Sequence, residues 1–199
     1  MSFEPMQKIP RLNRDMIITE KIDGTNAQIW IDLYVPPVTV DMELFQADLD
    51  GTTYYMLFGS RTRWLTAKND NYNFCKWGIE HKDELVKLGV GRHFGEWWGS
   101  GINRGYGLPK DDKRFSLFNT SRWNTENVPN CVSVVPELCK WTFDTSKINE
   151  TLHNLAETGS IAAPGFMNPE GIVVFHSAAQ NLFKVTIKDD EKPKGKVNV

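Results

Sequence analysis

Lys21 ends an apolar, strand-like stretch and directly precedes the turn sequence Asp-Gly-Thr-Asn. A lysine amine that has lost its proton is a nucleophile and can form a covalent intermediate with a substrate. A strand that ends at this residue would hold the side chain in place, and the neighbouring side chains would shelter it. An ordinary lysine at the mouth of a hairpin is the structural alternative, so Lys21 by itself does not establish any chemistry.

Five later segments contain residue types that bind phosphates, sugars, bases or metal ions. Arginine offers a planar pair of donors to phosphates and hydroxyls, and carboxylates accept from hydroxyls or bind hard cations. Each segment also has a plain structural explanation, as a surface charge, a strand-end carboxylate, a core aromatic or a solvated strand face. Their order and spacing are therefore more informative than any one of them. The segments are residues 59–61, 94–96, 115–119, 169–173 and 183–188.

Strand-like runs lie between turn signals along most of the chain. Residues 17–21 and 27–33 are apolar and flank the Asp-Gly-Thr-Asn turn, whereas residues 38–45 alternate between apolar and polar side chains. Asp50-Gly51 is typical of a hairpin turn. The sequence predicts further strands at residues 53–60, 92–97, 114–118, 132–135, 171–175 and 181–187.

Two segments show the spacing of apolar residues that is typical of helices. In residues 73–88 aromatic and apolar side chains recur at every third or fourth position, and Gly89 follows. The second helix is expected to begin at one of the N-cap candidates Asp144, Thr145 and Ser146 and to end at Gly159, with a stripe formed by Ile148, Leu152 and Leu155. We expect an α+β fold with mainly antiparallel sheets and flanking helices.

The composition is that of a packed globular protein. The chain has 199 residues, of which 40% are hydrophobic and 24% charged, which excludes a disordered chain, a collagen-like repeat and a coiled coil. No apolar run is long enough to cross a bilayer, and the first twenty residues lack a secretory signal. We therefore expect no membrane contact. The three cysteines are odd in number and show no metal-binding spacing, so we expect a reduced, cytoplasmic setting.

Taken together, the six segments resemble the motifs of the covalent nucleotidyltransferase superfamily, which comprises ATP-dependent DNA and RNA ligases and mRNA capping enzymes. The resemblance runs from about Thr19 to Lys188. Residues 20–26, Glu-Lys-Ile-Asp-Gly-Thr-Asn, look like the first motif, and the Thr-Asn ending is most like the nick-sealing RNA ligases. The five later segments resemble the further motifs in the family's order.

The resemblance implies an ATP-dependent polynucleotide ligase that joins a 5′-phosphate to a 3′-hydroxyl in three steps. Lys21 would take AMP from ATP, the AMP would pass to the 5′-phosphate, and the 3′-hydroxyl would then displace it. Lys184 would contact the α-phosphate. Lys188 would assist, because residues 184, 186 and 188 of an extended strand face one way.

The resemblance also assigns residues that would bind the nucleotide and a metal ion. The backbone around Glu20 would contact the edge of adenine, and Phe118 would stack on its face, with Phe115 as the fallback. Arg61 would bind a sugar hydroxyl or a phosphate, and Glu96 would accept from the ribose hydroxyls. Glu170 would help to bind Mg²⁺, with Mn²⁺ as an alternative. The implied cofactors are therefore ATP and a divalent cation.

RNA or DNA ends are the implied partners, and no obligate protein partner is evident. Asn26 would contact the 5′-phosphate end, and we expect Arg63 and Arg104 to contact nucleic acid. The glycine-rich segment 97–107 includes two tryptophans and a tyrosine, which could stack on unpaired bases. A core tryptophan pair beneath a flexible loop is the structural alternative for that segment.

The chain also departs from the family pattern at several positions. Thr186 stands where the fifth motif usually has a second lysine, and Asn119 stands where an aspartate is common. Asp23 replaces a histidine of the nick-sealing RNA ligases, which leaves a minimal DNA ligase core as an alternative. A non-catalytic nucleic-acid-binding module is the other alternative. We expect residues 1–188 to form one adenylation domain and residues 189–199 a polar tail, with no OB-fold domain.

Overall fold

The computed structural model describes residues 3–190, and the chain divides into two compact units. The first unit combines Met1–Lys21 with Pro136–Val199, and the second is Ile22–Val135. The chain therefore passes from one unit to the other directly after Lys21 and again directly after Val135. Among residues 3–190 there is no helix that could cross a membrane.

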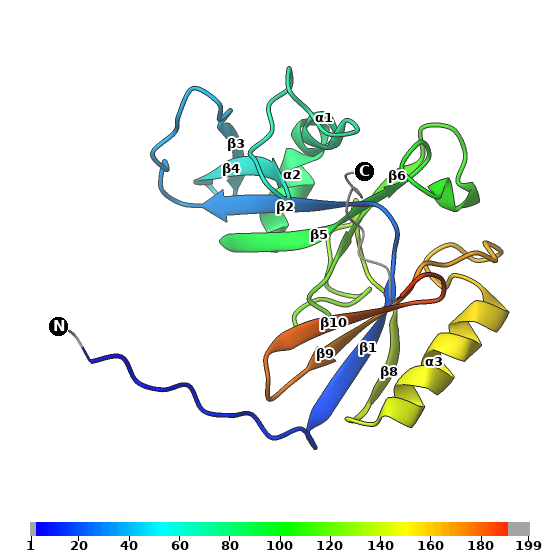
Figure 1. Ribbon diagram of the computed structural model, residues 1–199. Coiled ribbons are helices and arrows are strands. Elements are labelled where there is room, and N and C mark those ends of the chain that lie inside the picture. The colour runs from blue at the N-terminus through cyan, green and yellow to red at the C-terminus, as the bar shows by residue number, and fades with distance from the viewer. Residues whose placement is uncertain (1–2, 191–199) are drawn as a thin grey trace, which may run out of the picture. The chain divides into compact units, whose positions relative to one another are not determined.

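The first unit contains a four-stranded antiparallel sheet with the strand order β10-β9-β1-β8 (Figure 1). Its elements are β1 (Asp15–Lys21), β8 (Glu137–Thr142), α3 (Thr145–Thr158), β9 (Gly171–His176) and β10 (Asn181–Thr186). Alternation along β1 sends Met16 and Ile18 to one face, where they pack with Ile172, Val174 and Leu155 of α3. This face is the core of the unit.

Helix α3 begins and ends as its sequence predicts. The Asp144 carboxylate accepts from the Ser146 N–H at 2.8 Å, which satisfies a donor of the first turn. Gly159 follows the last turn with a φ of 84°, a left-handed conformation that glycine adopts without strain. The stripe of Ile148, Leu152 and Leu155 packs on the sheet, so the expected helix is confirmed.

The second unit contains a six-stranded sheet with the order β3-β4-β2-β5-β6-β7. Its strands are β2 (Thr25–Asp32), β3 (Phe45–Leu49), β4 (Thr52–Ser60), β5 (Gly91–Gly99), β6 (Lys113–Leu117) and β7 (Val132–Val134). All neighbours pair antiparallel except β6 and β7. The helices are α1 (Phe74–Glu80), α2 (Lys82–Leu85) and the short 3-10 helices η1 (Val86–Leu88) and η2 (Gly105–Gly107).

One face of this sheet is covered and the other carries polar and aromatic side chains. On the covered face, Ile29, Phe58 and Phe115 pack with Phe74 of α1 and Leu85 of α2. Because side chains alternate along each strand, the residues between these core positions lie on the opposite face. Asn26, Gln28, Phe94 and Glu96 are on that second face.

The structure corrects the predicted strand over residues 38–45. Residues 33–44 are irregular, and β3 begins only at Phe45. Val40, at one of the alternating apolar positions, is 99% exposed. Alternation stabilises a strand only when a neighbouring strand and a core receive it, and within residues 3–190 no strand pairs with residues 38–44. The preceding Pro36-Pro37 also lacks the N–H groups that a sheet ladder needs.

The predicted helix over residues 73–88 is divided into α1, α2 and η1. His81, between α1 and α2, has φ −111° and ψ 11°, which is not helical, and its ring Nδ1 lies 2.8 Å from the Trp77 carbonyl oxygen. Trp77 and Leu85 still face the core, so the periodicity identified the buried face but not the break. Strand β8 was not predicted, because residues 137–142 mix charged, aromatic and apolar side chains without a clear alternation.

Candidate functional site

Lys21 is the last residue of β1 and forms an ion pair inside the first unit. Its Nζ donates to the Oε2 of Glu170 at 2.6 Å, and the two side chains are 23% and 1% exposed, respectively. The register brings them together, because Lys21 lies opposite Gly171, the residue after Glu170. A side chain at Gly171 would overlap the Val185 carbonyl oxygen, which explains the Glu-Gly sequence at this position. The amine is therefore oriented by a buried carboxylate.

Lys184 lies on the same face of the sheet as Lys21. Lys21 is opposite Gly171, and Gly171 is opposite Thr186 on β10. Lys184 is two residues before Thr186, so its side chain leaves the sheet on the same side. Two strand spacings and the two-residue offset along β10 together amount to about 12 Å between the backbones, a distance that two lysine side chains can bridge around a phosphate. Lys184 is exposed, which leaves its ammonium accessible to a ligand.

The prediction that Lys188 continues this alternation is wrong. Strand β10 ends at Thr186, whose hydroxyl donates to the Lys188 carbonyl oxygen at 3.0 Å. The Thr186 N–H donates to the Asp190 carboxylate at 2.7 Å. These bonds form a bend, and the strand geometry that placed Lys188 beside Lys184 does not extend to it. The assistance expected from Lys188 stays a prediction without that geometric support.

The Glu20 side chain points to the other face of β1 and is 1% exposed. Its Oε1 accepts from the Ser160 hydroxyl at 2.5 Å, and its Oε2 accepts from the N–H groups of Ile161 and Ala162 at 2.8 and 2.9 Å. The Glu20 N–H itself donates to the Pro136 carbonyl oxygen at 2.9 Å. Glu20 thus fixes the end of β1, one residue before Lys21, by tying it to the loop after α3.

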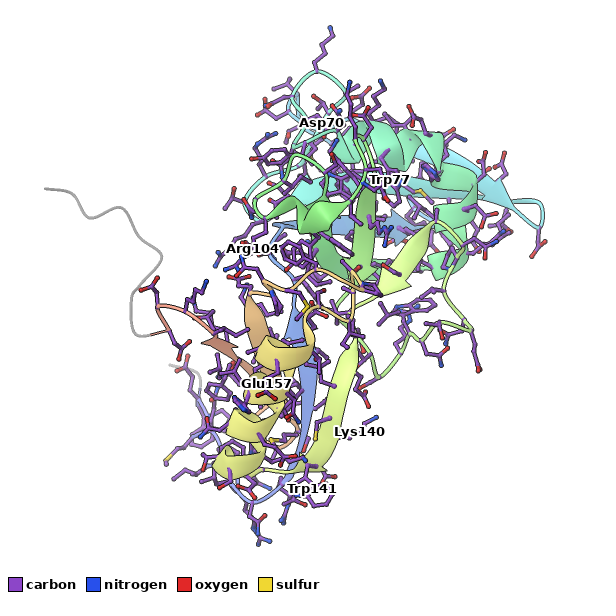
Figure 2. All side chains as sticks on the ribbon, turned by 90° about the vertical axis from the view of Figure 1, so that its right-hand side faces the viewer. Asp70, Trp77, Arg104, Lys140, Trp141 and Glu157 are labelled. Carbon is purple, nitrogen blue, oxygen red and sulfur yellow. The ribbon has the colours of Figure 1, made fainter. Side chains whose placement is uncertain are left out.

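We expect Glu20→Gln to lower the free energy of unfolding by about 2 kcal/mol, because hydrogen bonds to a buried carboxylate contribute more than neutral ones and the amide cannot accept all three. Urea unfolding measures this change. Glu157→Gln on α3 is the matched control, since Glu157 is 64% exposed and pairs with His153 (Figure 2). Equal stability of the two variants would contradict an anchoring role for Glu20.

Glu96 is the central carboxylate of the second unit. It is 7% exposed on β5 and accepts from the Gly24 N–H at 3.0 Å and from the Asn26 side-chain amide at 2.8 Å. Gly24 has no room for a side chain, because one would overlap the Trp97 carbonyl oxygen. The carboxylate expected to bind ribose is therefore held by the first motif. The Asn26 amide that was expected at a 5′-phosphate is already donating to Glu96.

Phe118 and Phe115 differ in their accessibility. Phe115 is completely buried in the core, so the fallback for adenine stacking is excluded on steric grounds. Phe118 directly follows β6 and is 39% exposed, two residues after Ser116, which lies opposite Glu96. Alternation thus places its ring on the same sheet face as Glu96. Its N–H donates to the Phe94 carbonyl oxygen at 3.0 Å.

The two predicted arginines near β4 have different surroundings. Arg61 is exposed and makes no hydrogen bond or ion pair to any of residues 3–190, so its guanidinium is available to a ligand. Arg63 donates to the carbonyl oxygens of Asn69 and Asp70 at 2.8 and 3.1 Å. Arg63 therefore organises the loop that follows β4, and this geometry does not favour the expected contact with nucleic acid.

The glycine-rich segment is folded rather than open. Trp97 and Trp98 are each 1% exposed and Tyr106 is 2% exposed, so the expectation that these rings stack on unpaired bases is wrong. Trp97 faces the core with Phe74, and Trp98 packs edge-on against Tyr106. Arg104 donates from Nε to the Asp23 carboxylate at 2.9 Å, so its charge is already compensated.

Two of the three cysteines, Cys75 and Cys131, do not offer a competing nucleophile. Burial, with a smaller contribution from the Asp70 carboxylate, raises the pKa of the Cys75 thiol to about 12. Burial also raises the pKa of Cys131 to about 11. Both thiols are therefore protonated at neutral pH, whereas the thiolate is the reactive form.

The residues present fit a divalent cation that is held mainly by a substrate. Within residues 3–190 there is no group of three or more histidine, cysteine, aspartate or glutamate residues that could hold a metal ion by itself. Mg²⁺ commonly takes one or two carboxylates and completes its shell with phosphates and water. Glu170 provides such a carboxylate beside Lys21.

Several residues at these positions were missed at the sequence level. Ser160, Ile161 and Ala162 hold Glu20 from 140 or more residues away, and nothing local marks them. Phe94 is 50% exposed beside Phe118, and its place two residues before Glu96 could have indicated a shared face. Asn103 and Tyr106 could not be assigned because glycines dominate their segment.

Comparison with known families tests the resemblance. A model of the family described as RNA ligase matches residues 14–186. The chain belongs to the RNA ligase family. The matched residues of this RNA ligase family member include Lys21, Glu96, Glu170 and Lys184. No match was found among curated proteins.

Solved structures of an RNA ligase from Naegleria gruberi share the fold of this RNA ligase family member. Two variants with ATP and Mn have TM-scores of 0.55 and 0.54 at 17% and 15% identity, covering 88% and 87% of this chain and 50% and 49% of theirs. The same ligase with PPi has a TM-score of 0.52 at 16% identity, covering 87% of this chain and 50% of its own. The chain thus spans about half the length of these ligases, and the expected α+β fold is confirmed.

Proposed function

We propose that this RNA ligase family member is an ATP-dependent ligase that joins a 5′-phosphate to a 3′-hydroxyl through a lysyl-AMP intermediate on Lys21. The observation that carries the proposal is the ion pair between Lys21 and the buried Glu170, with Lys184 on the same sheet face. An accessible amine held by a carboxylate, on the same sheet face as a second cation, suits attack on a phosphate that gains negative charge in the transition state. We assign this chemistry to residues 1–188.

The reaction would proceed in three steps, the first two at the α-phosphorus of ATP and the third at the 5′-phosphorus of the nucleic acid. Lys21 Nζ loses a proton and bonds to the α-phosphorus of ATP, and pyrophosphate leaves. An oxygen of the 5′-phosphate then attacks, the P–N bond breaks, and the lysine amine is restored. Finally the 3′-hydroxyl loses its proton and attacks the 5′-phosphorus, and AMP leaves. Lys184 would stabilise charge on the nonbridging oxygens at each transfer.

The second unit would supply the groups that recognise the nucleoside. Glu96 would accept from the ribose hydroxyls, Arg61 would bind a hydroxyl or a phosphate with its available guanidinium, and Phe118 would stack on adenine. In the first unit, Glu170 would hold a divalent cation, Mg²⁺ or Mn²⁺, which neutralises phosphate charge when bound. ATP is the proposed cofactor, and RNA ends, DNA ends or both are the proposed partners.

We expect Phe118→Ala to raise the KM for ATP in self-adenylylation about tenfold or more, because aromatic stacking on a base contributes about 1–3 kcal/mol. The rate of adduct formation at several ATP concentrations measures this change. Trp141→Ala is the matched control, since Trp141 is an exposed aromatic of β8, 57% accessible (Figure 2). A KM unchanged by Phe118→Ala would show that adenine binds elsewhere.

A joining assay tests the proposed activity. The purified chain is incubated with ATP, Mg²⁺ and labelled substrates that have a 5′-phosphate and a 3′-hydroxyl, as single-stranded RNA, nicked RNA, nicked DNA and hybrid nicks. We expect joining of RNA substrates and release of AMP. Joining of DNA nicks alone would establish the DNA ligase alternative, and binding of all substrates without joining would establish a non-catalytic module.

A further inference from the structure

The segment Ile102–Tyr106 crosses the turn that follows the first motif's lysine and binds it at several points. The Asp23 N–H donates to the Tyr106 hydroxyl at 2.7 Å. The Asn103 amide donates to the Gly24 carbonyl oxygen at 2.6 Å and to the Asp23 carboxylate at 3.0 Å. Arg104 pairs with the same carboxylate at 2.9 Å. All of these contacts lie within the second unit.

These contacts and Glu96 together hold three successive peptide groups of the turn. In the first, the Asp23 N–H donates to the Tyr106 hydroxyl. In the second, the Gly24 N–H donates to the Glu96 carboxylate at 3.0 Å. In the third, the Gly24 carbonyl oxygen accepts from the Asn103 side-chain amide. A peptide group fixed on both sides cannot rotate, so the Gly24 N–H is aimed at the Glu96 carboxylate. The orientation of Glu96 thus depends on the segment that holds the turn.

The backbone conformation of residues 102–106 is independent evidence that the surrounding structure holds this segment in place. Asn103 and Tyr106 have φ values of 44° and 53°, in the left-handed region that a bulky tyrosine rarely adopts. Such conformations cost free energy and persist where the surrounding structure holds them. Here the buried side chains of Ile102 and Tyr106 anchor the segment, while Asn103 and Arg104 reach the turn (Figure 2 labels Arg104).

We propose that residues 102–106 form a strap that orients the turn 23–24 and, through the Gly24 N–H, the Glu96 carboxylate, so that Asn103, Arg104 and Tyr106 are positioning residues for nucleotide binding. This inference rests on the proposed function, in which Glu96 binds the ribose. It also gives Asp23 an internal task as the acceptor for Asn103 and Arg104. The aspartate is then explained by the strap rather than by a preference for DNA.

The test compares Arg104→Ala, Asp23→Asn and Tyr106→Phe with the unaltered chain and with Arg114→Ala. Arg114 is a matched control because it forms a similar ion pair with Asp112 at 2.9 Å in the same unit and lies over the Trp98 ring, whereas its hydrogen bonds go to Asp112 and not to residues 23–24. We expect each strap variant to raise the KM for ATP about tenfold with a smaller change in the maximal adenylylation rate. Arg114→Ala should leave both parameters unchanged.

A second measurement separates positioning from a loss of folding. In the Glu96→Ala background, Arg104→Ala should cause no further rise in KM, because the group through which the strap acts is gone. Additive effects of the two substitutions would overturn the proposal. Thermal unfolding of each variant confirms that the protein is folded, and Asp23→Asn tests the ion pair while retaining the size of the side chain.

A third measurement does not depend on activity. In NMR spectra, Arg104→Ala should shift the Gly24 amide resonance and speed its hydrogen exchange, whereas Arg114→Ala should not. An unchanged Gly24 amide in Arg104→Ala would overturn the strap even if the chain is an active ligase. Conversely, absence of any adduct in the unaltered chain would overturn the proposed function. The resonance and hydrogen exchange of the Gly24 amide in Arg104→Ala would still test the strap in that case.

Discussion

Lys21→Ala should form no acid-stable protein–AMP adduct when the chain is incubated with labelled ATP and Mg²⁺. The expected loss is complete, because no other side chain can replace the amine that bonds to the α-phosphorus. Lys21→Arg should fail as well. Arginine keeps a positive charge beside Glu170 but stays protonated, so it cannot act as the nucleophile. The pair of variants therefore separates a nucleophile from a residue that only supplies charge.

Lys140→Ala is the matched control for this experiment. Lys140 belongs to β8 in the same sheet, is 61% exposed and pairs with Glu137 at 3.5 Å, as surface lysines often do (Figure 2). The Lys140→Ala variant should form the Lys21–AMP adduct as fast as the unaltered chain. A labelled adduct in Lys21→Ala would move the nucleophile to another residue and would remove the basis of the proposed mechanism.

Lys184→Ala should slow adduct formation by at least about 100-fold while the protein stays folded. Removing one preorganised group that stabilises a developing oxyanion typically costs two to three orders of magnitude. Lys184 is exposed, so its loss should hardly change the free energy of unfolding. Single-turnover adenylylation and urea unfolding measure the two quantities.

The rate of adduct formation in Lys188→Ala tests whether Lys188 replaces the second lysine that the fifth motif lacks in this chain. A reduction of ten-fold or more would show that Lys188 serves the phosphate despite its position in the bend after β10. An unchanged rate would assign the phosphate contact to Lys184 alone. A near-normal rate in Lys184→Ala, by contrast, would contradict the assignment of the fifth motif to this strand.

The sequence predicted the strands that carry the motifs because each motif is short and local. Lys21 at the end of β1, Glu170 just before β9 and Lys184 within β10 follow from apolar runs bounded by turn residues. Helix α3 was predictable for the same reason, since its caps and its stripe are read from one stretch of chain.

The burial of the aromatic side chains near the glycine-rich segment could not be predicted, because it depends on what covers each face of the sheet. Trp97 and Trp98 point to opposite faces of β5, and both are buried, one by the core and one by Tyr106. The alternation at Val40 failed for the converse reason, since no strand or core receives it. Periodicity identifies a face but not its neighbour.

The pairing of β1 has a consequence for the nascent chain. Its two neighbours in the sheet, β8 and β9, are encoded more than 110 residues later, and the donors that hold Glu20 belong to residues 160–162. A polypeptide whose synthesis has not passed residue 136 has none of these partners available. The surroundings of Lys21 therefore cannot form until residues 160–176 have been synthesised, and we expect a product that ends before them to form no lysyl-AMP adduct.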